Sequence, residues 1–434
     1  MAQSRGNWSG TLGFVLAAMG SAVGLGNVWR FPFVTGEYGG AAFILVYLGF
    51  VLAVGIPIMT AELLVGRSTQ RGIIGAFSTL RPGSAWLVTG WLGATTSFVL
   101  LSYYSVVGGW VLHYMYISLT GGFAGLSTEA IGQSFTSLST SPALQMFWHA
   151  AFMLTTIWVV SRGVSRGIEW GNKIMMPALF LMLCCLLVYA LTTEGAAEGI
   201  AFLLTPHWDK IGPQAVLAAL GQAFFSLSVG LGMLVTYGSY LQRDSNLPRS
   251  ALFVAASDTG IALLAGFVIF PLVFTFQLEP NAGPALIFET LPITFSQLPF
   301  GQFLAVLFFL LLTFAALSSS MSALEVVVAY VVDERGWSRP SASWMTGGTI
   351  FIVGLFSAVN GIDRADALVT NYLLPLGGLL VAIFAGWSLT HQERRAEVPA
   401  NDLSSGLYYG WVFLIRYVAP IAVAIILVQS IGLF

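Results

Sequence analysis

Charged side chains are scarce in this sequence. Asp, Glu, Lys and Arg make up 8% of the 434 residues, whereas hydrophobic residues make up 57% and the mean hydropathy is +0.84. A water-soluble domain usually carries about a quarter of its residues as charged side chains. The composition therefore excludes a water-soluble domain and predicts an all-α polytopic membrane protein.

Cysteine and histidine are also scarce. The two cysteines, Cys184 and Cys185, are adjacent within an apolar run, and this spacing argues against a disulfide framework or a zinc site. The four histidines lie far apart without metal-binding spacing, and no nucleophile motif stands out. The net charge is −2 and there is no basic tail, which argues against a nucleic-acid partner.

Long apolar runs are abundant instead. About 18 or more mostly apolar residues can cross a bilayer, and eleven runs meet this requirement. The first begins near Thr11, is longer than the apolar region of a signal peptide and has no convincing cleavage site, so we expect it to be retained. The predicted spans are residues 11–35, 40–65, 86–118, 143–161, 168–191, 214–240, 248–276, 300–332, 341–358, 366–389 and 407–432.

Two segments between the predicted spans differ from short polar loops. Residues 119–142 are rich in glycine, serine and threonine and contain no lysine or arginine. Residues 277–299 place four prolines around short apolar stretches. This second pattern favours a structured re-entrant or capping loop over a further span.

The basic residues predict the orientation of the spans, because lysine and arginine resist translocation. With a cytoplasmic N-terminus, 13 of the 17 basic residues fall on the cytoplasmic side, in loops or at the adjoining ends of spans, and only Lys210 and Arg364 fall in external loops. We therefore expect a multi-pass protein of the cytoplasmic membrane, with the N-terminus in the cytoplasm and the C-terminus outside.

The string VGLG occurs twice, at residues 23–26 in the first span and 229–232 in the sixth. Five spans separate the copies, so the second crosses the membrane in the opposite sense, as an inverted repeat of five plus five spans would produce. The single domain, residues 1–434, would then divide into a first repeat (1–191), a second repeat (214–390) and an extra eleventh span (407–434).

Glycines inside a span have two interpretations. Small residues let membrane helices pack closely, and for one copy of VGLG alone this interpretation is equally good. Interruptions at corresponding positions of two halves indicate instead unwound helices around the central binding site of a transporter. Unwinding frees amides that suit a carboxylate and carbonyls that suit a small cation or an ammonium group. Lipid tolerates such backbone only where it lines a cavity.

Longer stretches around these glycines follow one another along essentially the whole chain. They are GSAVGLGNVWRFP (20–32), Gly39 and Gly40, Glu62, Gly66 and Arg67, QAFFSLSVGLGMLVTYGSY (222–240), SDTGIALLAGFVIFP (257–271) and FAALSSSMSALE (314–325). This series resembles the neurotransmitter:sodium symporters. The resemblance implies a LeuT-type fold with spans 1 and 6 unwound, and a secondary active transporter that moves an amino acid together with sodium.

The resemblance also implies two sodium sites built from oxygen donors, which hard cations prefer. The first site would use Ala22, Asn27, Ser226 and Asp258. The second would use the backbone of Gly20, Val23 and Ala315 and the hydroxyls of Ser318 and Ser319. Helix packing is the alternative for the serines, whereas a buried amide such as that of Asn27 needs partners.

By the same resemblance, the substrate carboxylate would contact the amides of Leu25 and Gly26 and the hydroxyl of Tyr104. The other residues expected around the substrate are Ala22, Leu100, Phe224, Phe225, Ser226, Ser228, Leu231, Ser322 and Ala323. This pocket is mostly apolar and has no charged side chain, so a hydrophobic or aromatic amino acid fits best. The alternative for Tyr104 is an aromatic residue at the membrane interface.

Asp258 and Glu62 are carboxylates inside predicted spans, where a charge is costly and indicates function. Asp258 stands where many animal relatives have asparagine and require chloride, and the later serine of those relatives is Ala262 here. We expect Asp258, near Tyr47 and Gln222, to replace the charge of chloride and to accept a proton on the return step; a helix cap is the alternative. The resemblance implies that Glu62 stabilises the unwound first helix; the alternative is that it binds freed amides without contacting an ion.

The resemblance also implies closures at both ends of the site. Arg30 and Asp366 would close the outer vestibule with Phe225 as a lid, and Asp363 is a competing choice for the acid. The residues of the inner closure would be Arg5, Asp333, Trp8 and Tyr240. Solvated loop charge is the alternative for both ion pairs.

The function that follows is sodium-coupled amino acid import by alternating access, independent of chloride and without enzymatic chemistry. The expected partners are the amino acid, two sodium ions and the lipid bilayer, and an oligomer is neither required nor excluded. Two other classes stay open on the same scaffold: a channel, which would need no paired closures, and an amino-acid-binding membrane sensor.

Overall fold

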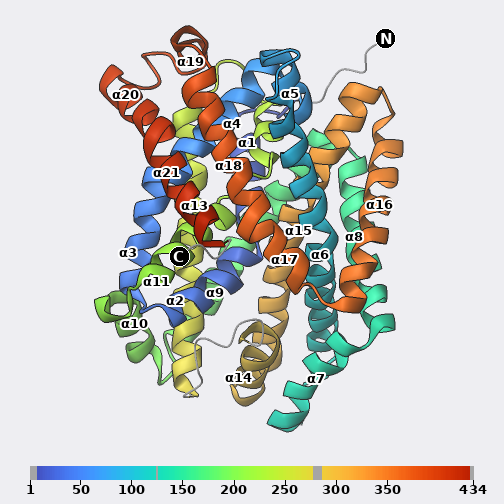
Figure 1. Cartoon of the computed structure of the whole chain (residues 1–434). Helices are drawn as coiled ribbons and strands as arrows, with labels where there is room; N and C mark the ends of the chain where they lie inside the picture. The colour runs from blue at the N-terminus through green and yellow to red at the C-terminus, as the bar shows by residue number, and fades with distance from the viewer. Residues whose placement is uncertain (1–6, 124–125, 277–285, 431–434) are drawn as a thin grey trace.

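Long helices run side by side between the two ends of the molecule (Figure 1). The computed structural model describes residues 7–123, 126–276 and 286–430. Within these ranges it contains helices, turns and one isolated bridge between Gly40 and Pro206, but no β-strand. The predicted all-α class is confirmed.

Several spans consist of α-helices joined without a gap to short π-helical turns, labelled η; only η4 is a 3-10 turn. The elements up to residue 190 are α1 (Thr11–Ala22), η1 (Gly26–Arg30), α2 (Phe31–Glu37), α3 (Ala41–Phe50), η2 (Val51–Gly55), α4 (Ile56–Thr69), α5 (Ile73–Leu80), α6 (Leu87–Leu119), α7 (Thr128–Thr140), α8 (Pro142–Ser161), η3 (Val164–Glu169) and α9 (Trp170–Ala190). The elements that follow are α10 (Ala196–Leu204), η4 (Trp208–Lys210), α11 (Pro213–Ser226), α12 (Met233–Gly238), α13 (Leu247–Thr275), η5 (Leu286–Thr290), α14 (Leu291–Gln297), α15 (Gly301–Arg335), α16 (Arg339–Asn360), α17 (Asp363–Leu368), η6 (Val369–Leu373), α18 (Leu374–Ile383), η7 (Phe384–Ser388), α19 (His391–Glu397), α20 (Ser405–Phe413), η8 (Leu414–Val418) and α21 (Ala419–Ser430).

The apolar runs correspond closely to helices. In the described residues nine helices are long and apolar enough to cross a membrane, and α1 with η1–α2 forms a tenth span bent by 52°. The bounds of these spans differ from the predicted ones by at most four residues. The predicted sixth span appears as α11 and α12, two shorter helices separated by residues 227–232. The count of eleven therefore stays a prediction that depends on this interrupted pair.

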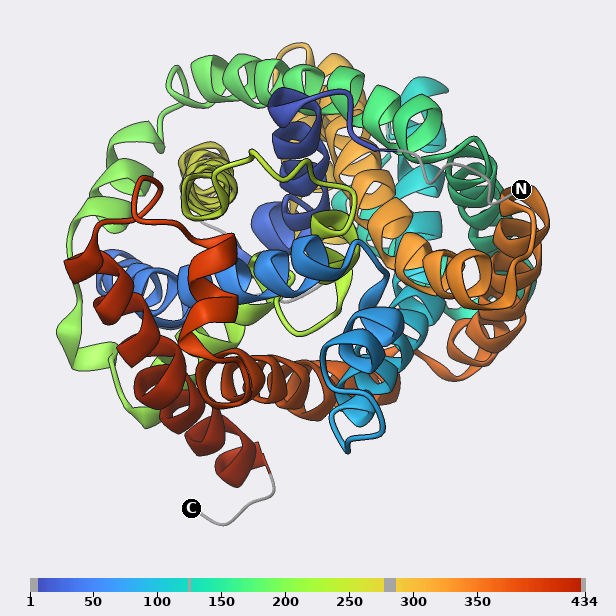
Figure 2. The same ribbon diagram turned by 90° about the horizontal axis from the view of Figure 1, so that it is seen from above.

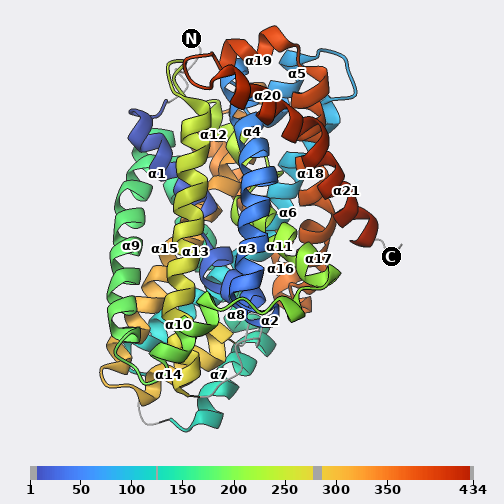
Figure 3. The same cartoon turned by 90° about the vertical axis from the view of Figure 1, so that its left-hand side faces the viewer.

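The two ends of the bundle carry different short helices. Helices α5 and α19 lie at one end, at the top of Figures 1 and 3, and α7, α10 and α14 lie at the other. Viewed along the bundle in Figure 2, α1 lies inward of α9, and it packs against α9, α13 and α15. Helix α1, which ends directly before the first VGLG, is therefore packed among other helices.

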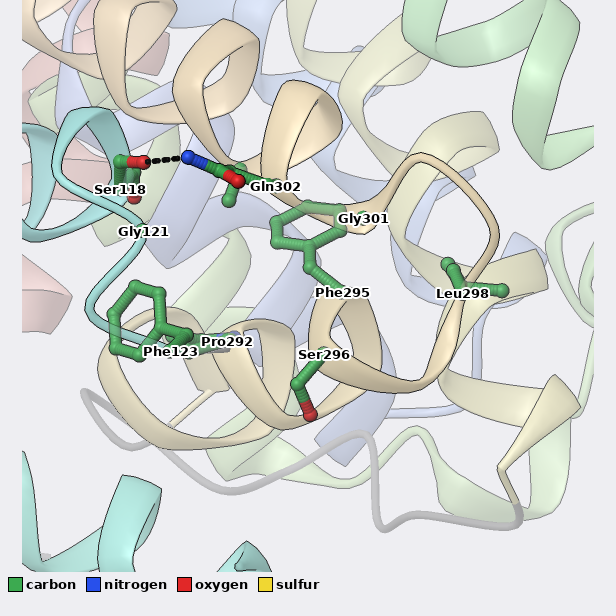
Figure 4. A pocket seen from close by; sticks show the side chains of 10 residues that line it. Ser118, Gly121, Phe123, Pro292, Phe295, Ser296, Leu298, Gly301 and Gln302 are labelled. Atoms are coloured by element: carbon green, nitrogen blue, oxygen red, sulfur yellow. Dashed lines mark hydrogen bonds between the residues drawn. The ribbon is translucent and has the colours of Figure 1, made fainter. Parts of the chain in front are cut away.

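The two unusual segments contain helices. The polar segment 119–142 includes α7, which begins after Ser127, whose hydroxyl caps the helix by accepting from Ala130 N at 3.3 Å. The described part of 277–299 forms η5 and α14, which confirms a structured loop there. Between α14 and the start of α15 lies a cavity of about 120 Å³, where Gln302 Nε2 donates to Ser118 O at 3.4 Å (Figure 4).

Candidate substrate and sodium site

The first span breaks within its first VGLG string. Helix α1 ends at Ala22, Val23 is extended (φ −69°, ψ 104°), and helical backbone resumes at Gly26. Asn27 bridges the break, because its Oδ1 accepts a hydrogen bond from Gly24 N at 3.0 Å. This whole stretch is buried. The predicted interruption is present.

The second VGLG string also interrupts its span. Helix α11 ends at Ser226 and α12 begins at Met233. Between them Ser228, Gly230 and Gly232 have φ values of 53°, 88° and 77°. This left-handed region suits glycine, which has no Cβ to clash with the following carbonyl. The sixth span therefore unwinds as predicted.

Side chains and backbone groups from other segments satisfy the polar groups that unwinding frees. Ser97 Oγ of α6 donates to Leu231 O at 2.6 Å. Ser228 Oγ donates to Ser21 O at 3.0 Å, which connects the second break to the last turn of α1. An unpaired backbone group costs several kcal/mol in lipid, so these bonds help to make the irregular backbone tolerable.

Glu62 lies beside the second break. Its Oε1 accepts a hydrogen bond from Gly230 N at 2.7 Å, and its side chain is fully buried. The expectation that it also stabilises the first break stays a prediction, because the hydrogen bond that Glu62 forms in the described structure is to the second break. Its contact with a freed amide matches the alternative interpretation.

Three of the four residues predicted for the first sodium site meet through their side chains. Asn27 Nδ2 donates to Asp258 Oδ1 at 2.6 Å and to Ser226 Oγ at 3.2 Å. Ser226 Oγ donates to Asp258 Oδ2 at 2.6 Å. The fourth, Ala22, ends α1 and lines the adjoining cavity. All these residues are buried, so the oxygens lie in a site shielded from water.

The carboxylate of Asp258 has no basic partner in the described residues. No lysine or arginine there forms an ion pair with it. Gln222 Nε2 donates to Gly26 O at 3.1 Å, and the buried Tyr47 hydroxyl lies near Asp258 and Ser226. A buried, unpaired charge is costly, so a cation would stabilise this cluster.

All five residues predicted for the second sodium site converge between the first break and α15. Ser319 Oγ donates to the carbonyls of Gly20 and Val23, each at 3.4 Å. Ser318 Oγ lies 3.4 Å from Val23 O and 3.0 Å from Ala315 O. The arrangement gathers two hydroxyls and three carbonyls, which are the ligand types of a hard cation.

A cavity lies between the two breaks. Leu25 N points toward Tyr104 Oη at 3.5 Å, so a freed amide and a hydroxyl face each other where a carboxylate is expected. The cavity measures about 30 Å³, enough for one or two waters, so an amino acid requires its walls to move apart. The lining residues are Ala22, Gly24, Leu25, Gly26, Leu100, Tyr104, Phe225, Ser228, Leu231, Met233 and Ser319.

Not every residue predicted for the pocket lines this cavity. The exceptions are Phe224, Ser226, Ser322 and Ala323. The Ser322 hydroxyl lies 2.7 Å from Tyr237 Oη, one turn of α15 away from Ser319, which does line the cavity. Sequence analysis missed Gly24, Ser319 and Met233 as lining residues. Met233 directly follows the second VGLG, as Asn27 follows the first, and this correspondence was a usable signal.

The outer closure residues surround Phe225. The guanidinium carbon of Arg30 lies 4.9 Å from the centre of the Phe225 ring. Asp366 attracts Arg30 electrostatically without a direct ion pair in the described structure, and its Oδ1 accepts a hydrogen bond from Tyr103 Oη at 3.0 Å. Asp363 is exposed, so Asp366 is the acid that acts on Arg30.

The described residues of the inner closure lie close together. Trp8 Nε1 donates to Tyr237 O at 3.0 Å, and the Trp8 ring lies 5.9 Å from the ring of Tyr240 in an edge-on arrangement. Asp333 Oδ2 accepts from the backbone N–H that precedes α5, at 3.2 Å. Arg5, the predicted partner of Asp333, lies outside the described residues.

A buried ion pair beside this closure was not predicted. Tyr240 Oη donates to Glu325 Oε1 at 2.6 Å, and Arg339 forms an ion pair with the other carboxylate oxygen of Glu325. Arg339 Nε also donates to Val160 O at 3.0 Å, so the pair connects α8, α15 and α16. The signal was available, because Glu325 interrupts an apolar run and an intramembrane carboxylate indicates function by default.

Comparisons with known proteins agree with this geometry. The model of the "Sodium:neurotransmitter symporter family" matches residues 5–129 and 130–434. The sodium-dependent transporter YhdH of Bacillus subtilis (strain 168) is 40% identical over 440 residues, which cover 98% of each chain. The human sodium- and chloride-dependent transporter XTRP3 is 32% identical over 297 residues, which cover 62% of this chain and 50% of the relative.

A solved structure shares the fold. The crystal structure of MhsT in complex with L-phenylalanine superposes with a TM-score of 0.92 and 44% identity, covering 98% of this chain and 100% of that one. The family match over nearly the whole chain, the full-length bacterial relative and the common fold show that this chain belongs to the sodium:neurotransmitter symporter family, whose members are membrane transporters and not enzymes.

Proposed function

We propose that the chain is a sodium-coupled symporter that imports a hydrophobic or aromatic amino acid by alternating access. The observation that carries this proposal is the meeting of two broken helices around one cavity, with candidate cation sites on both sides of the first break. Freed amides near Tyr104 would bind the substrate carboxylate, and carbonyls at the ends of α1 and α11 would bind its ammonium group.

The lining of the cavity supports an apolar substrate. Leu100, Phe225, Leu231 and Met233 provide most of its side-chain surface, and no charged residue lines it. MhsT, which has the same fold, is solved with L-phenylalanine. We infer that the side chain of a large apolar amino acid occupies the space that opens when Phe225 moves outward.

We infer two sodium ions, one at each oxygen cluster, with different electrostatic character. The cluster of Asn27, Ser226 and Asp258 includes a carboxylate, whereas the cluster around Ser318 and Ser319 consists of neutral oxygens. A fixed negative charge at Asp258 would compensate the sodium charge without a bound anion. We therefore propose that transport is independent of chloride.

We propose that the chain lies in the cytoplasmic membrane with a cytoplasmic N-terminus and an external C-terminus. The distribution of basic loop residues supports this orientation. It assigns the closure around Tyr240 to the inside and that around Arg30 to the outside. The two five-span repeats, residues 1–191 and 214–390, would rock against each other about the cavity, with 407–434 as the extra span.

Uptake by the purified chain in proteoliposomes tests the proposal. A labelled aromatic amino acid is offered with the common amino acids as competitors, at several sodium concentrations and pH values. We expect aromatic and large aliphatic amino acids to compete and charged ones not to compete. Binding without uptake would indicate a sensor, and equilibration that ignores the sodium gradient would indicate a channel; either result contradicts the proposal.

A further inference from the structure

A groove opens on the outside of the bundle between α8, the start of α9 and α15. Its volume is about 190 Å³, and its floor consists of Phe314, Leu317 and Met321 of α15. Trp158 of α8 and Trp170 of α9 form its walls, and they are 48% and 58% exposed in the described chain. Figure 3 shows α9 next to α15 along this side of the molecule. The groove is therefore an apolar slot that faces the lipid.

Two arginines line the same groove where its helices end. Arg162 directly follows α8, and Arg166 lies in η3 at the beginning of the next span. The guanidinium carbon of Arg162 lies 3.9 Å from the centre of the Trp158 ring, an arrangement that holds the cation over the slot. In the described residues neither arginine forms an ion pair, and no acidic residue lines the groove.

The charge of this groove distinguishes it from other apolar pockets of the described chain. A larger pocket beside α20 contains Arg249 but also Asp402, which offsets the positive charge. A pocket near the start of α11 contains the single base Lys210. Two unpaired guanidiniums above an apolar slot match a ligand with an anionic head and an acyl chain, which is the chemistry of an anionic phospholipid.

We propose that this groove binds an anionic phospholipid from the leaflet at the arginine-rich end of the molecule, with its phosphate between Arg162 and Arg166. The acyl chain lies along the exposed tryptophans and the floor of α15. This inference goes beyond the proposed transport function and does not depend on the identity of the substrate.

The groove lies next to helices that the transport cycle would have to move apart. Phe314 and Leu317 alternate along α15 with Ala315 and Ser318 of the candidate second sodium site. In η3, the Glu169 carboxylate accepts a hydrogen bond from Ser9 N at 3.0 Å, ahead of α1. A lipid that bridges α8 and η3 therefore opposes the separation of α9 from α1 and α15, and stabilises the form in which the inner closure is shut.

Lipid retention in bilayer nanodiscs tests the proposal. The full chain is reconstituted with phosphatidylglycerol and phosphatidylcholine of the same acyl chains, and retained lipid is counted by native mass spectrometry. The wild type is expected to prefer phosphatidylglycerol, and R162Q/R166Q to lose about 30-fold in that preference, about fivefold for each arginine. The midpoint of thermal unfolding should rise with phosphatidylglycerol in the wild type and not in the variant.

Matched variants make the outcome decisive. R243Q/R335Q removes two exposed arginines from the same end, outside the groove, and should keep the preference. Gly171→Leu keeps both arginines but fills the slot, since a Cβ at this position meets only Met175 and Met321, at 3.6 and 3.8 Å. This variant should lose the retained phosphatidylglycerol. It replaces R162Q/R166Q as the test if that variant fails to fold. Glycerol phosphate in solution should not displace the lipid. Three results would overturn the proposal. The wild type could retain both lipids equally, the two double variants could lose the preference equally, or glycerol phosphate could displace the lipid.

Discussion

Asp258 is the residue whose chemistry most constrains the transport cycle. Its carboxylate is fully buried within a span and accepts hydrogen bonds only from the neutral side chains of Asn27 and Ser226 in the described structure. A charge in such a place is expensive unless a cation balances it. On the proposed function, the side chain would favour sodium binding and would replace the charge of a bound anion.

The substitution Asp258→Asn tests this assignment. It keeps the shape of the side chain and removes the charge, so the apparent sodium affinity of uptake should fall about tenfold or more, and the residual uptake should become chloride-dependent. Sodium titrations in chloride and in gluconate buffer measure both effects, with exposed Asp209→Asn as the control. Chloride-independent uptake by Asp258→Asn, or loss of wild-type uptake in gluconate, contradicts the assignment.

Variants of two neighbouring serines of α15 distinguish a role in cation binding from a role in helix packing. The Ser319 hydroxyl reaches the carbonyls at the first break, whereas the Ser320 hydroxyl bonds to Leu317 O and to Thr156 Oγ1. Ser319→Ala should weaken the apparent sodium affinity about tenfold. Ser320→Ala should lower the unfolding temperature with little change in sodium affinity. If the two variants had the same sodium dependence, the second sodium site would be misplaced.

At the scale of elements, the two breaks determine the shape of the site. The glycine at position 26 lets the Phe225 ring approach the first break, because a Cβ there would lie 2.8 Å from two ring carbons. A Cβ at Gly221, one turn earlier in α11, would meet no atom of the described chain within 4 Å. These glycines therefore provide a matched pair.

Gly26→Ala should displace Phe225 and weaken substrate affinity, since an added methyl group in a packed site costs about 1–3 kcal/mol. Gly221→Ala should leave affinity unchanged and can stabilise α11 slightly. Equilibrium binding of labelled phenylalanine to both variants, with their unfolding temperatures, measures the difference. Equal affinities would show that the packing of Phe225 on Gly26 does not shape the site.

Helix α19 is attached to the bundle by an ion pair outside the spans. Arg81 contacts both oxygens of Glu393, at 2.8 and 2.9 Å. The hydrogen bond from Arg81 lowers the pKa of Glu393 from 4.5 to about 2. A carboxyl with a lowered folded pKa stabilises the fold above its unfolded pKa, and this contribution is lost as the pH falls from about 4.5 to 2.

We therefore expect the unfolding temperature of the wild type to exceed that of Glu393→Gln by a small, constant amount above about pH 5, and the difference to shrink below pH 4.5. The amount is small because the pair is partly exposed and screened. Thermal unfolding in detergent at several pH values measures it. A difference that persists unchanged at pH 3 contradicts the expectation.

The sequence predicts the bounds of the helices better than the directions in which their side chains point. Apolar runs give the span bounds, since length and hydropathy suffice to cross a bilayer. They do not fix the rotation of a helix that is apolar on most sides, so Ser322 was expected in the pocket but contacts Tyr237. Nor do they give the path of unwound backbone, on which the contact of Glu62 with Gly230 depends.

At the scale of the whole molecule, one central cavity lies between two closures built from different chemistry. The outer closure brings Arg30 over Phe225 under the attraction of Asp366, and the inner one combines Trp8 and Tyr240 with a buried ion pair. The cavity between them measures about 30 Å³. An amino acid therefore fits between the two predicted closures only when the walls of this cavity move apart.

Accumulation of L-phenylalanine in proteoliposomes under an imposed sodium gradient tests the central claim most directly. With sodium outside and potassium inside, internal phenylalanine should rise above the external concentration and fall back when a sodium ionophore collapses the gradient. Choline in place of external sodium should abolish accumulation. Internal phenylalanine that never exceeds the external concentration, or that accumulates equally in choline, would contradict sodium-coupled transport of this substrate.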